Sequence, residues 1–406
     1  MWALAHRDAS LKTAQLWLGY RVGSASESPG ATGVAHLLEH LMFEGTALYP
    51  EFDAVIQKAG GSSNAFTGQD LTCYYESLPD ANLHVALALE SDRMRNAQLS
   101  DDKIEIQRRV VLEEYKERYI NNPYGDVWHH LRALCFKNHP YAWPVIGRSL
   151  GEVAGLTSET IRRFHHQHYR PENAALVVVS PRCEEEVLEQ AARYFEGLIF
   201  EKSDTGFVPS TSLSQSVEPT EREMKVERPV PDSMIYLAWR TPPCTEEDSV
   251  GLDVLAEWLG GSESSVLYRK YIRHQPLFTA VQAFQMEGVL GGLFLIVGRL
   301  SQGVSFEKAK NVLLQEVNRL EDNVPDPIHL RRVVKMARMS RAFDLTSPAA
   351  RARRLVWFQT LLGDASLEAR FMSLYEAASP EWLQALARKY LISDSVFVLE
   401  YAATQE

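Results

Sequence analysis

The sequence predicts an α+β protein made of two similar lobes. The main observation is an internal repeat, because four segments of the first half recur in the same order in the second half. A duplication at this period, far longer than that of a solenoid repeat, predicts two lobes of one fold. The matched segments are residues 18–21 and 237–240 (LGYR and LAWR), 36–40 and 254–258, 108–111 and 331–334 (RRVV in both), and 158–180 and 379–400.

Hydrophobic periodicity supports the same class, because each half mixes strand-like and helix-like stretches. Residues 13–22 (TAQLWLGYRV) alternate and are rich in aromatic and branched side chains, which predicts a strand, and residues 174–180 form an apolar strand. Residues 62–75 are prone to form β structure and fit an edge strand. Helices are predicted at residues 33–46, 52–58, 81–95, 102–120, 158–169 and 184–198.

The boundary between the lobes is predicted from composition. Residues 202–221 are rich in Ser, Thr, Pro and Glu and show no periodicity, which indicates a linker. Residues 1–201 would then form an N-terminal lobe, and residues 222–406 a C-terminal lobe of the same fold.

Charge and cysteine usage exclude several classes of function. The net charge of −11 over 406 residues gives no basic surface for nucleic acid. The four cysteines are scattered, so neither a disulfide framework nor a thiolate zinc site is expected. The longest apolar run, residues 289–298, is too short to span a membrane. No signal peptide opens the sequence, so the location stays open between cytoplasmic and, if a leader was removed, periplasmic.

The segment GVAHLLEHLMFEGT (residues 33–46) carries the chemistry. It is almost wholly apolar apart from His36, Glu39 and His40, so it predicts a buried helix. His36 and His40 are four residues apart and therefore lie on one face of that helix. Burying two imidazoles and a carboxylate without partners is costly, and a divalent metal would satisfy them. The order His-x-x-Glu-His is the inverted form of a zinc-peptidase motif.

A catalytic zinc takes three protein ligands and leaves a position for water. The predicted helix at residues 102–120 offers Glu113, Glu114 and Glu117, although a run of charges is more often a solvated helix face. The second lobe lacks both histidines, and whichever glutamate is the ligand is missing there too. Periodicity does not separate Glu113 from Glu114. The repeat aligns the three glutamates with Met336, Ala337 and Ser340.

These motifs resemble the pitrilysin-type (M16) zinc metallopeptidases, and the length of the chain resembles the short, M16B-like subfamily. The resemblance covers essentially the whole chain and places the third ligand on Glu114. It implies that each lobe is a largely antiparallel sheet packed with helices. Besides the His-x-x-Glu-His motif, the segments that resemble family signatures are residues 60–74 (GGSSNAFTGQDLTCY), 110–114 (VVLEE) and 168–173 (HYRPEN).

The resemblance implies a zinc-dependent endopeptidase that hydrolyses oligopeptides or unfolded segments, with one Zn²⁺ per chain. His36, His40 and Glu114 would hold the metal, and Glu39 would act as general base. The backbone of residues Asn64, Ala65 and Phe66 would pair with a peptide substrate in extended form.

Two positions depart from the family pattern. The family usually has a glutamate seven residues before the third ligand, where this chain has Gln107; a neutral amide can still hydrogen-bond the metal ligands. Active members also carry an Arg/Tyr pair in the second lobe that binds the substrate carbonyl, and the matching positions here are Ile272 and Thr279. A homologous partner subunit that carries the Arg/Tyr pair is therefore expected, which makes this chain the zinc-bearing half of a heterodimer.

Three alternatives remain open from the sequence. The chain could be a non-catalytic core or scaffold subunit of the same fold. It could be a self-sufficient homodimeric peptidase that uses Arg273 or Arg269 in place of the missing pair. The metal could also be structural, with Glu39 only orienting a histidine.

Overall fold

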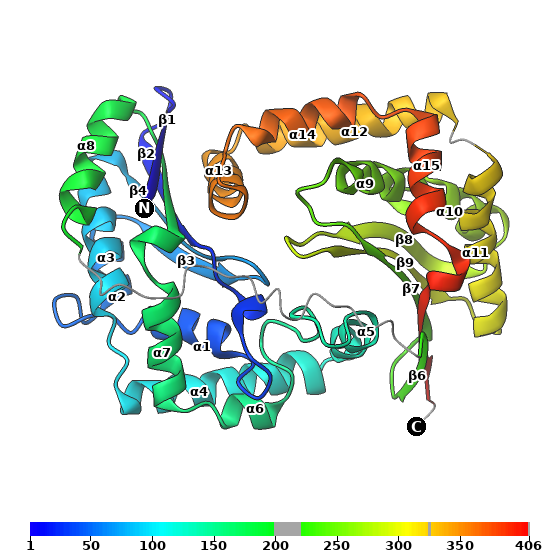
Figure 1. The fold of residues 1–406 in the computed structure, drawn as a ribbon, viewed down its shortest axis with the longest axis horizontal. Helices are drawn as coiled ribbons and strands as arrows, with labels where there is room; N and C mark the ends of the chain where they lie inside the picture. Colours follow the sequence, from blue (N-terminus) through cyan, green and yellow to red (C-terminus); the bar gives the residue numbers. More distant parts are fainter. Residues whose placement is uncertain (199–220, 324–325, 405–406) are drawn as a thin grey trace. The chain divides into compact units, whose positions relative to one another are not determined.

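The computed structural model describes residues 1–198, 221–323 and 326–404. Nearly all of the predicted linker at 202–221 lies outside these residues, so the division of the chain at that segment stays a prediction. The chain forms two compact units, which are described separately (Figure 1). The first unit comprises residues 1–118, the described residues from 139 to 198, and residues 343–368. The second comprises residues 119–138, the described residues from 221 to 342, and those from 369 onward.

A five-stranded mixed sheet forms the centre of the first unit, in the order β1-β5-β2-β4-β3. Only the β1–β5 pair is parallel, and β3 lies at the far edge of the sheet. The strands are rich in branched and aromatic residues, which suits a pleated, half-buried surface. Their bounds are β1 Trp2–Arg7, β2 Thr13–Tyr20, β3 Ser62–Thr67, β4 Thr72–Pro79 and β5 Ala174–Ser180.

Helices pack on both faces of this sheet. α3 and α8 contact β2 and β1, α13 contacts β5 and β2, and α1 lies against α4, α7 and the edge strand β3. A π-helical turn, Lys116–Ile120, continues α4. The helices are α1 Val34–Leu41, α2 Phe52–Lys58, α3 Leu83–Asn96, α4 Asp101–Tyr115, α6 Leu150–Ala154, α7 Ser158–His168, α8 Glu184–Phe195 and α13 Pro348–Leu362.

A buried charged cluster joins α3 to the sheet. The guanidinium of Arg93 is fully buried, donates to Glu90, and lies 3.5 Å from Glu76 Oε1 on β4. It also lies over the rings of Tyr74 and Phe52, at 4.2 and 4.3 Å from their centroids. Burial together with the neighbouring Glu90 carboxylate raises the pKa of Glu76 well above its ordinary value. Removing the guanidinium would therefore leave two buried carboxyl groups without their cation.

The second unit repeats this architecture. Its sheet has the order β6-β10-β7-β9-β8, in which each strand takes the place of its counterpart in the first sheet, including the one parallel pair. The strands are β6 Glu223–Arg228, β7 Met234–Thr241, β8 Phe278–Met286, β9 Gly292–Leu300 and β10 Phe397–Ala403. Two of its helices, α12 and α14, reach the unit boundary. The helices are α5 Val127–Cys135, α9 Glu247–Gly260, α10 Val266–Tyr268, α11 Phe306–Asp322, α12 Pro327–Asp344, α14 Leu367–Glu376 and α15 Pro380–Tyr390.

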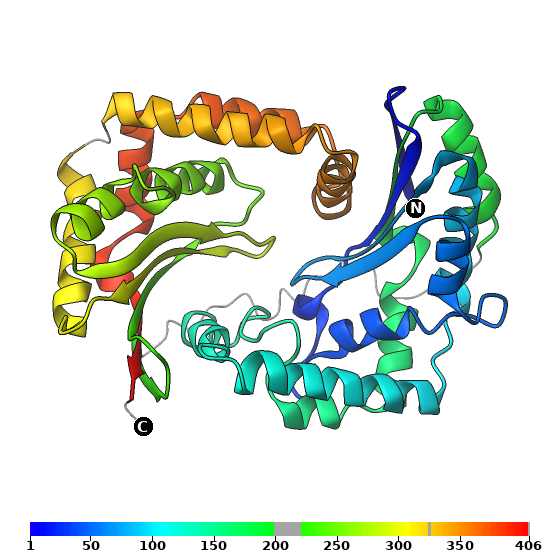
Figure 2. The same cartoon turned by 180° about the vertical axis from the view of Figure 1, so that it is seen from behind.

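One helix from each half of the sequence packs on the sheet of the other half. α13 belongs to the first unit and packs on β2 and β5, whereas α5 belongs to the second unit and packs on β7 and β10 (Figures 1 and 2). Gly19 permits the close approach of α13, because a Cβ there would lie 2.7 Å from Thr360 Oγ1 and 2.8 Å from Val356 Cγ2. The repeat aligns α5 with α13, so the exchange is reciprocal.

The structure confirms the predicted fold class of two similar α+β lobes, with the single parallel pair making each sheet mixed. All four repeat matches fall on equivalent elements: β2 and β7, α1 and α9, α4 and α12, and the pairs α7–β5 and α15–β10. Several details differ from the sequence analysis. Residues 62–75, expected to fit an edge strand, contribute to two antiparallel strands, β3 and β4, of which only β3 lies at the edge. The helix predicted at residues 33–46 ends at Leu41, and β1 was missing from the prediction. Within the described part of the chain, no helix combines the length and the apolar character that a membrane crossing requires.

Candidate functional site

The helix that carries the histidines, α1, is fixed at its N-terminus by a buried carboxylate. Gly33, the residue before α1, has φ +90°, and a Cβ there would lie 2.6 Å from the carbonyl oxygen of Ile146. Glu27 accepts hydrogen bonds from the backbone N–H of Gly33 and of Ala35, both at 2.9 Å, and from Trp143 Nε1 at 3.0 Å. These bonds satisfy N–H groups that a helix N-terminus leaves without partners. Burial raises the pKa of Glu27 to about 8.

The structure brings His36, His40 and Glu114 together. His36 Nε2 lies 3.8 Å from Glu114 Oε1, and His40 Nε2 lies 3.4 Å from Glu114 Oε2. The potential ligand atoms of the three residues all lie within 4.8 Å of one another. Glu113 points elsewhere: its side chain is 73% exposed and pairs with Lys116 at 2.7 Å, whereas that of Glu114 is 17% exposed. The structure therefore brings Glu114, and not Glu113, into the cluster with the two histidines.

Two of the three clustered side chains have protonation states that suit a metal ligand. Burial, reinforced by the neighbouring His40, lowers the pKa of His36 to about 4, so its imidazole is neutral at pH 7 and can act as a ligand. The hydrogen bond from His40 lowers the pKa of Glu114, which keeps its carboxylate ionised. Arg118 Nη1 lies 2.9 Å from Glu114 Oε1. Two imidazoles and one carboxylate form a donor set that catalytic zinc sites use.

Gln107 orients one of the histidines from the side. Its amide forms a hydrogen bond with the ring of His40, and its Nε2 donates to Glu44 Oε1 at 2.5 Å. A carboxylate at position 107 would instead face the carboxylate of Glu44. The neutral amide therefore suits its neighbours here, and it retains the hydrogen bond that a metal-ligating histidine makes with its surroundings.

Glu39 lies on the same helix, and its carboxylate contacts the hydroxyl of Thr67. Thr67 Oγ1, at the end of β3, donates a hydrogen bond to Glu39 Oε2. Burial raises the pKa of Glu39, and this hydrogen bond opposes the rise. A carboxylate of raised pKa beside a candidate metal cluster is suited to accept and return protons. The sequence motif contained Thr67 but indicated no role for it, and it gave no indication of the roles of Glu27 or Glu44.

The predicted substrate strand is an edge strand. Asn64, Ala65 and Phe66 lie on β3, which pairs with β4 alone among the described strands. Its other edge therefore offers backbone groups that an extended peptide can pair with. Because Thr67 ends the same strand and contacts Glu39, this edge runs directly toward the candidate base.

In the second unit, the positions expected to carry the Arg/Tyr pair do not form a carbonyl clamp. Ile272 packs against the hydrophobic core, and Thr279 is exposed at an irregularity in β8. The adjacent Arg273 pairs with Glu263 at 3.2 Å and lies over the ring of Tyr268, 5.5 Å from its centroid. The side chain of Arg273 is thus held by its own unit.

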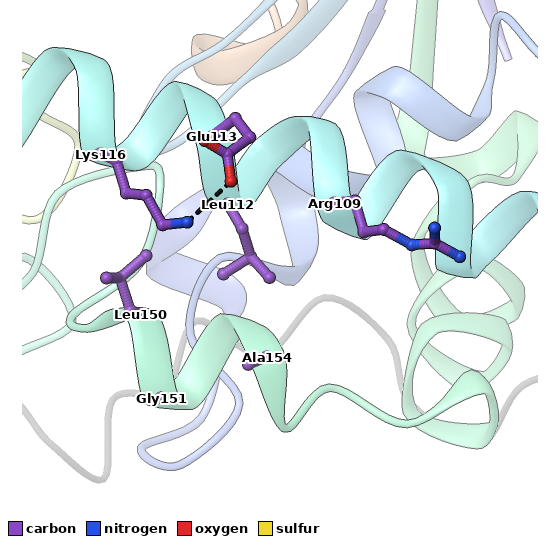
Figure 3. Close-up of a pocket in the computed structure, with 7 residues that line it drawn as sticks. All are labelled: Arg109, Leu112, Glu113, Lys116, Leu150, Gly151 and Ala154. Carbon is purple, nitrogen blue, oxygen red and sulfur yellow. Dashed lines mark hydrogen bonds and ion pairs between the residues drawn. The ribbon is translucent and has the colours of Figure 1, made fainter.

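A surface groove of about 530 Å³ lies between α4 and α6 (Figure 3). Its lining combines apolar side chains with three charged ones. Among the lining residues only Glu113 was a candidate ligand, and helical geometry places those that come from the α4 helix and its continuation on the side turned away from Glu114. The lining residues are Arg109, Leu112, Glu113, Lys116, Leu150, Gly151 and Ala154.

Comparison with known proteins gives consistent matches. The zinc protease PqqE of Helicobacter pylori is 29% identical over 305 residues, which are 74% of this chain and 68% of that protein. A probable mitochondrial-processing peptidase subunit beta of Arabidopsis thaliana is 24% identical over 415 residues, with 98% of this chain and 76% of that protein covered. The crystal structure of a protease from H. pylori has the same fold, with a TM-score of 0.91 at 24% identity and 98% and 96% coverage.

Two family models match successive parts of the chain. Residues 3–148, which contain the three clustered side chains, match the model described as insulinase (peptidase family M16). Residues 155–336, which contain most of the unit without histidine ligands, match the model described as the peptidase M16 inactive domain. Since both models belong to one family and the fold agrees with them, the chain is a member of the M16 peptidase family.

Proposed function

We propose that this chain is the zinc-bearing subunit of a metalloendopeptidase that hydrolyses oligopeptides or unfolded segments. The observation that carries the proposal is the convergence of His36, His40 and Glu114, with Glu39 on the same helix. The names of relatives such as the zinc protease PqqE support it. One Zn²⁺ per chain fits the donor set of two imidazoles and one carboxylate.

Each residue of the candidate site has its own role in peptide hydrolysis. A bound Zn²⁺ would supply Lewis acidity for the attacking water and the scissile carbonyl. His36, His40 and Glu114 hold the ion, and Gln107 keeps the ring of His40 in place. Glu39 accepts a proton from the attacking water and delivers it to the leaving amine, which completes the hydrolysis.

The substrate is proposed to bind as an added strand. Asn64, Ala65 and Phe66 offer their backbone groups along the open edge of β3, which an extended chain can use and a folded helix cannot. In this mode the contacts are made mainly with the backbone of the substrate and less with its side chains. It favours oligopeptides and unfolded segments over folded proteins.

A homologous partner subunit is proposed to supply the Arg/Tyr pair. The support is the identity of Ile272 and Thr279 at the matching positions, together with the ion pair that holds Arg273 to Glu263. A relative named as the beta subunit of a processing peptidase is consistent with work in an assembly.

Zinc content tests the ligand set. The wild type should bind about one zinc per chain, the Glu114→Gln variant much less, and the matched Glu113→Gln variant as much as the wild type. Zinc retained by Glu114→Gln would move the third ligand to another glutamate. No zinc in the wild type, even after zinc is added back, would favour the scaffold alternative.

The role of Glu39 is tested separately. Glu39→Gln should retain zinc and lose nearly all peptidase activity, because the amide cannot accept the proton. Full activity in that variant would leave the metal with a structural role only.

The proposed partner is tested by adding a homologous chain that carries the Arg/Tyr pair. Peptidase activity should rise strongly over that of this chain alone. Full activity alone, with no stimulation by such a chain, would support the homodimeric alternative and contradict the heterodimer.

A further inference from the structure

We propose that Thr67 is a positioning residue that holds the carboxylate of Glu39 for proton transfer. The inference rests on the proposed function, in which Glu39 is the general base. It assigns a role in catalysis to the last residue of the substrate strand, and so it links peptide binding on β3 to the chemistry on α1.

The contact is specific to one oxygen of the carboxylate. The hydroxyl of Thr67 donates to Glu39 Oε2, which leaves Oε1 to accept a hydrogen bond from the attacking water. A glutamate side chain has three rotatable bonds, and fixing it beforehand removes an entropic cost from the reaction. The hydroxyl therefore restricts the carboxylate to one orientation before the substrate arrives.

Hydrogen bonds hold the backbone on both sides of Thr67. The turn that follows β3 is closed by a hydrogen bond of 2.7 Å from Gly68 N–H to the carbonyl of Leu71. Within that turn, the carboxylate of Asp70 accepts the hydroxyl of the buried Tyr141, at 2.7 and 2.6 Å to its two oxygens. These contacts set the end of β3 and thereby the place of the Thr67 hydroxyl.

The second unit offers an internal comparison. Glu257 on α9 is the counterpart of Glu39 in the repeat, and α9 packs beside β8, the counterpart of β3. Within the described residues, no hydroxyl donates to Glu257, and burial raises the pKa of its carboxyl group. The unit that lacks the histidines thus also lacks the hydroxyl contact, as expected if the contact serves catalysis rather than the fold.

The test compares Thr67→Val with Thr67→Ser, because valine keeps the shape of threonine and serine keeps its hydroxyl. Thr67→Val should lower kcat about 10- to 100-fold, part of the 10²- to 10⁴-fold that a general base contributes. KM and zinc content should stay at the wild-type values, because the substrate pairs with backbone and the three ligands are intact. Thr67→Ser should recover most of kcat. Thr13→Val, an exposed substitution on β2, is the matched control.

A crystal structure of Thr67→Val adds a readout that does not depend on activity. The side chain of Glu39 should occupy more than one rotamer in the variant and a single one in the wild type. In a cycle with Glu39→Gln, the valine substitution should cause no additional loss of kcat, since both act on one group.

The outcomes separate this inference from the function on which it rests. Three results would overturn the positioning role and leave the function intact. They are a wild-type kcat in Thr67→Val, equal losses of kcat in Thr67→Val and Thr67→Ser, and a loss of zinc from Thr67→Val. Undiminished activity in Glu39→Gln would instead overturn the proposed function.

Discussion

Glu27 makes the stability of the metal-free protein depend on pH, and a single substitution can expose this effect. Its carboxyl group is buried at the start of α1, and the charged neighbour that acts on it is Glu152, whose negative charge raises the pKa further. The perturbation is Glu27→Gln, which keeps the size of the side chain and removes the ionisation.

The magnitude follows from the pKa, which rises from its ordinary 4.5 to about 8 on folding. Because the folded pKa is higher, the stabilising contribution of Glu27 is complete below pH 4.5 and is lost as the pH rises through about 8. Each pKa unit corresponds to about 1.4 kcal/mol, so the wild type should lose roughly 3 kcal/mol of unfolding free energy between pH 5 and pH 8 through this group. The Glu27→Gln variant should lack that loss.

Urea denaturation of the zinc-free protein between pH 5 and pH 8 measures the difference. The two stability curves should diverge as the pH rises, with the variant relatively more stable at pH 8. Glu189→Gln, at an exposed position on α8, should run parallel to the wild type. A constant difference between Glu27→Gln and the wild type across this range would refute the reasoning.

Three other substitutions test packing and metal binding. Arg93→Met should lower the free energy of unfolding by about 3–5 kcal/mol, because two buried carboxyl groups lose their cation; urea denaturation measures this, and a neutral result would show that the cluster does not need its charge. Gln107→Ala should weaken zinc binding about 10- to 100-fold in a competition with a chelator, because the ring of His40 loses its hydrogen bond, whereas the exposed Gln57→Ala should have no effect. Gly19→Val should cost about 1–3 kcal/mol by overpacking against α13, and protease cleavage within residues 343–368 should increase; an unchanged cleavage pattern would contradict the packing.

The sequence predicted the fold largely through its repeat. Strands such as β5 and helices such as α2 were predicted at their observed bounds, because apolar runs and glycine stops are local signals. β1 was missed because it is short and four of its six residues are exposed, which weakens the alternation. The exchange of α5 and α13 could not be predicted, since neither helix was among those predicted and no local pattern indicates which sheet a helix covers.

For the candidate site, the motif predicted the histidines and the nearby glutamate, and the structure shows why the rest was harder to find. α4 exposes Ile106 and Val110, so its apolar residues do not mark which face is buried. Periodicity therefore could not separate Glu113 from Glu114, whereas the family resemblance and the packing of α4 against α1 both do. Glu27 and Thr67 both lie outside α1, and their contacts with α1 form only in the folded chain. No local sequence pattern therefore indicates these contacts.

The exchange of helices also sets the order in which the protein can be completed during synthesis. The sheet of the first unit is fully translated at residue 180, yet the helix that covers its Gly19 face ends only at residue 362. Until then, one apolar face of the completed sheet stays uncovered, because the segment that covers it ends nearly two hundred residues downstream. The nascent first half should therefore depend on chaperones, and the two halves produced as separate chains should become soluble only when they are made together.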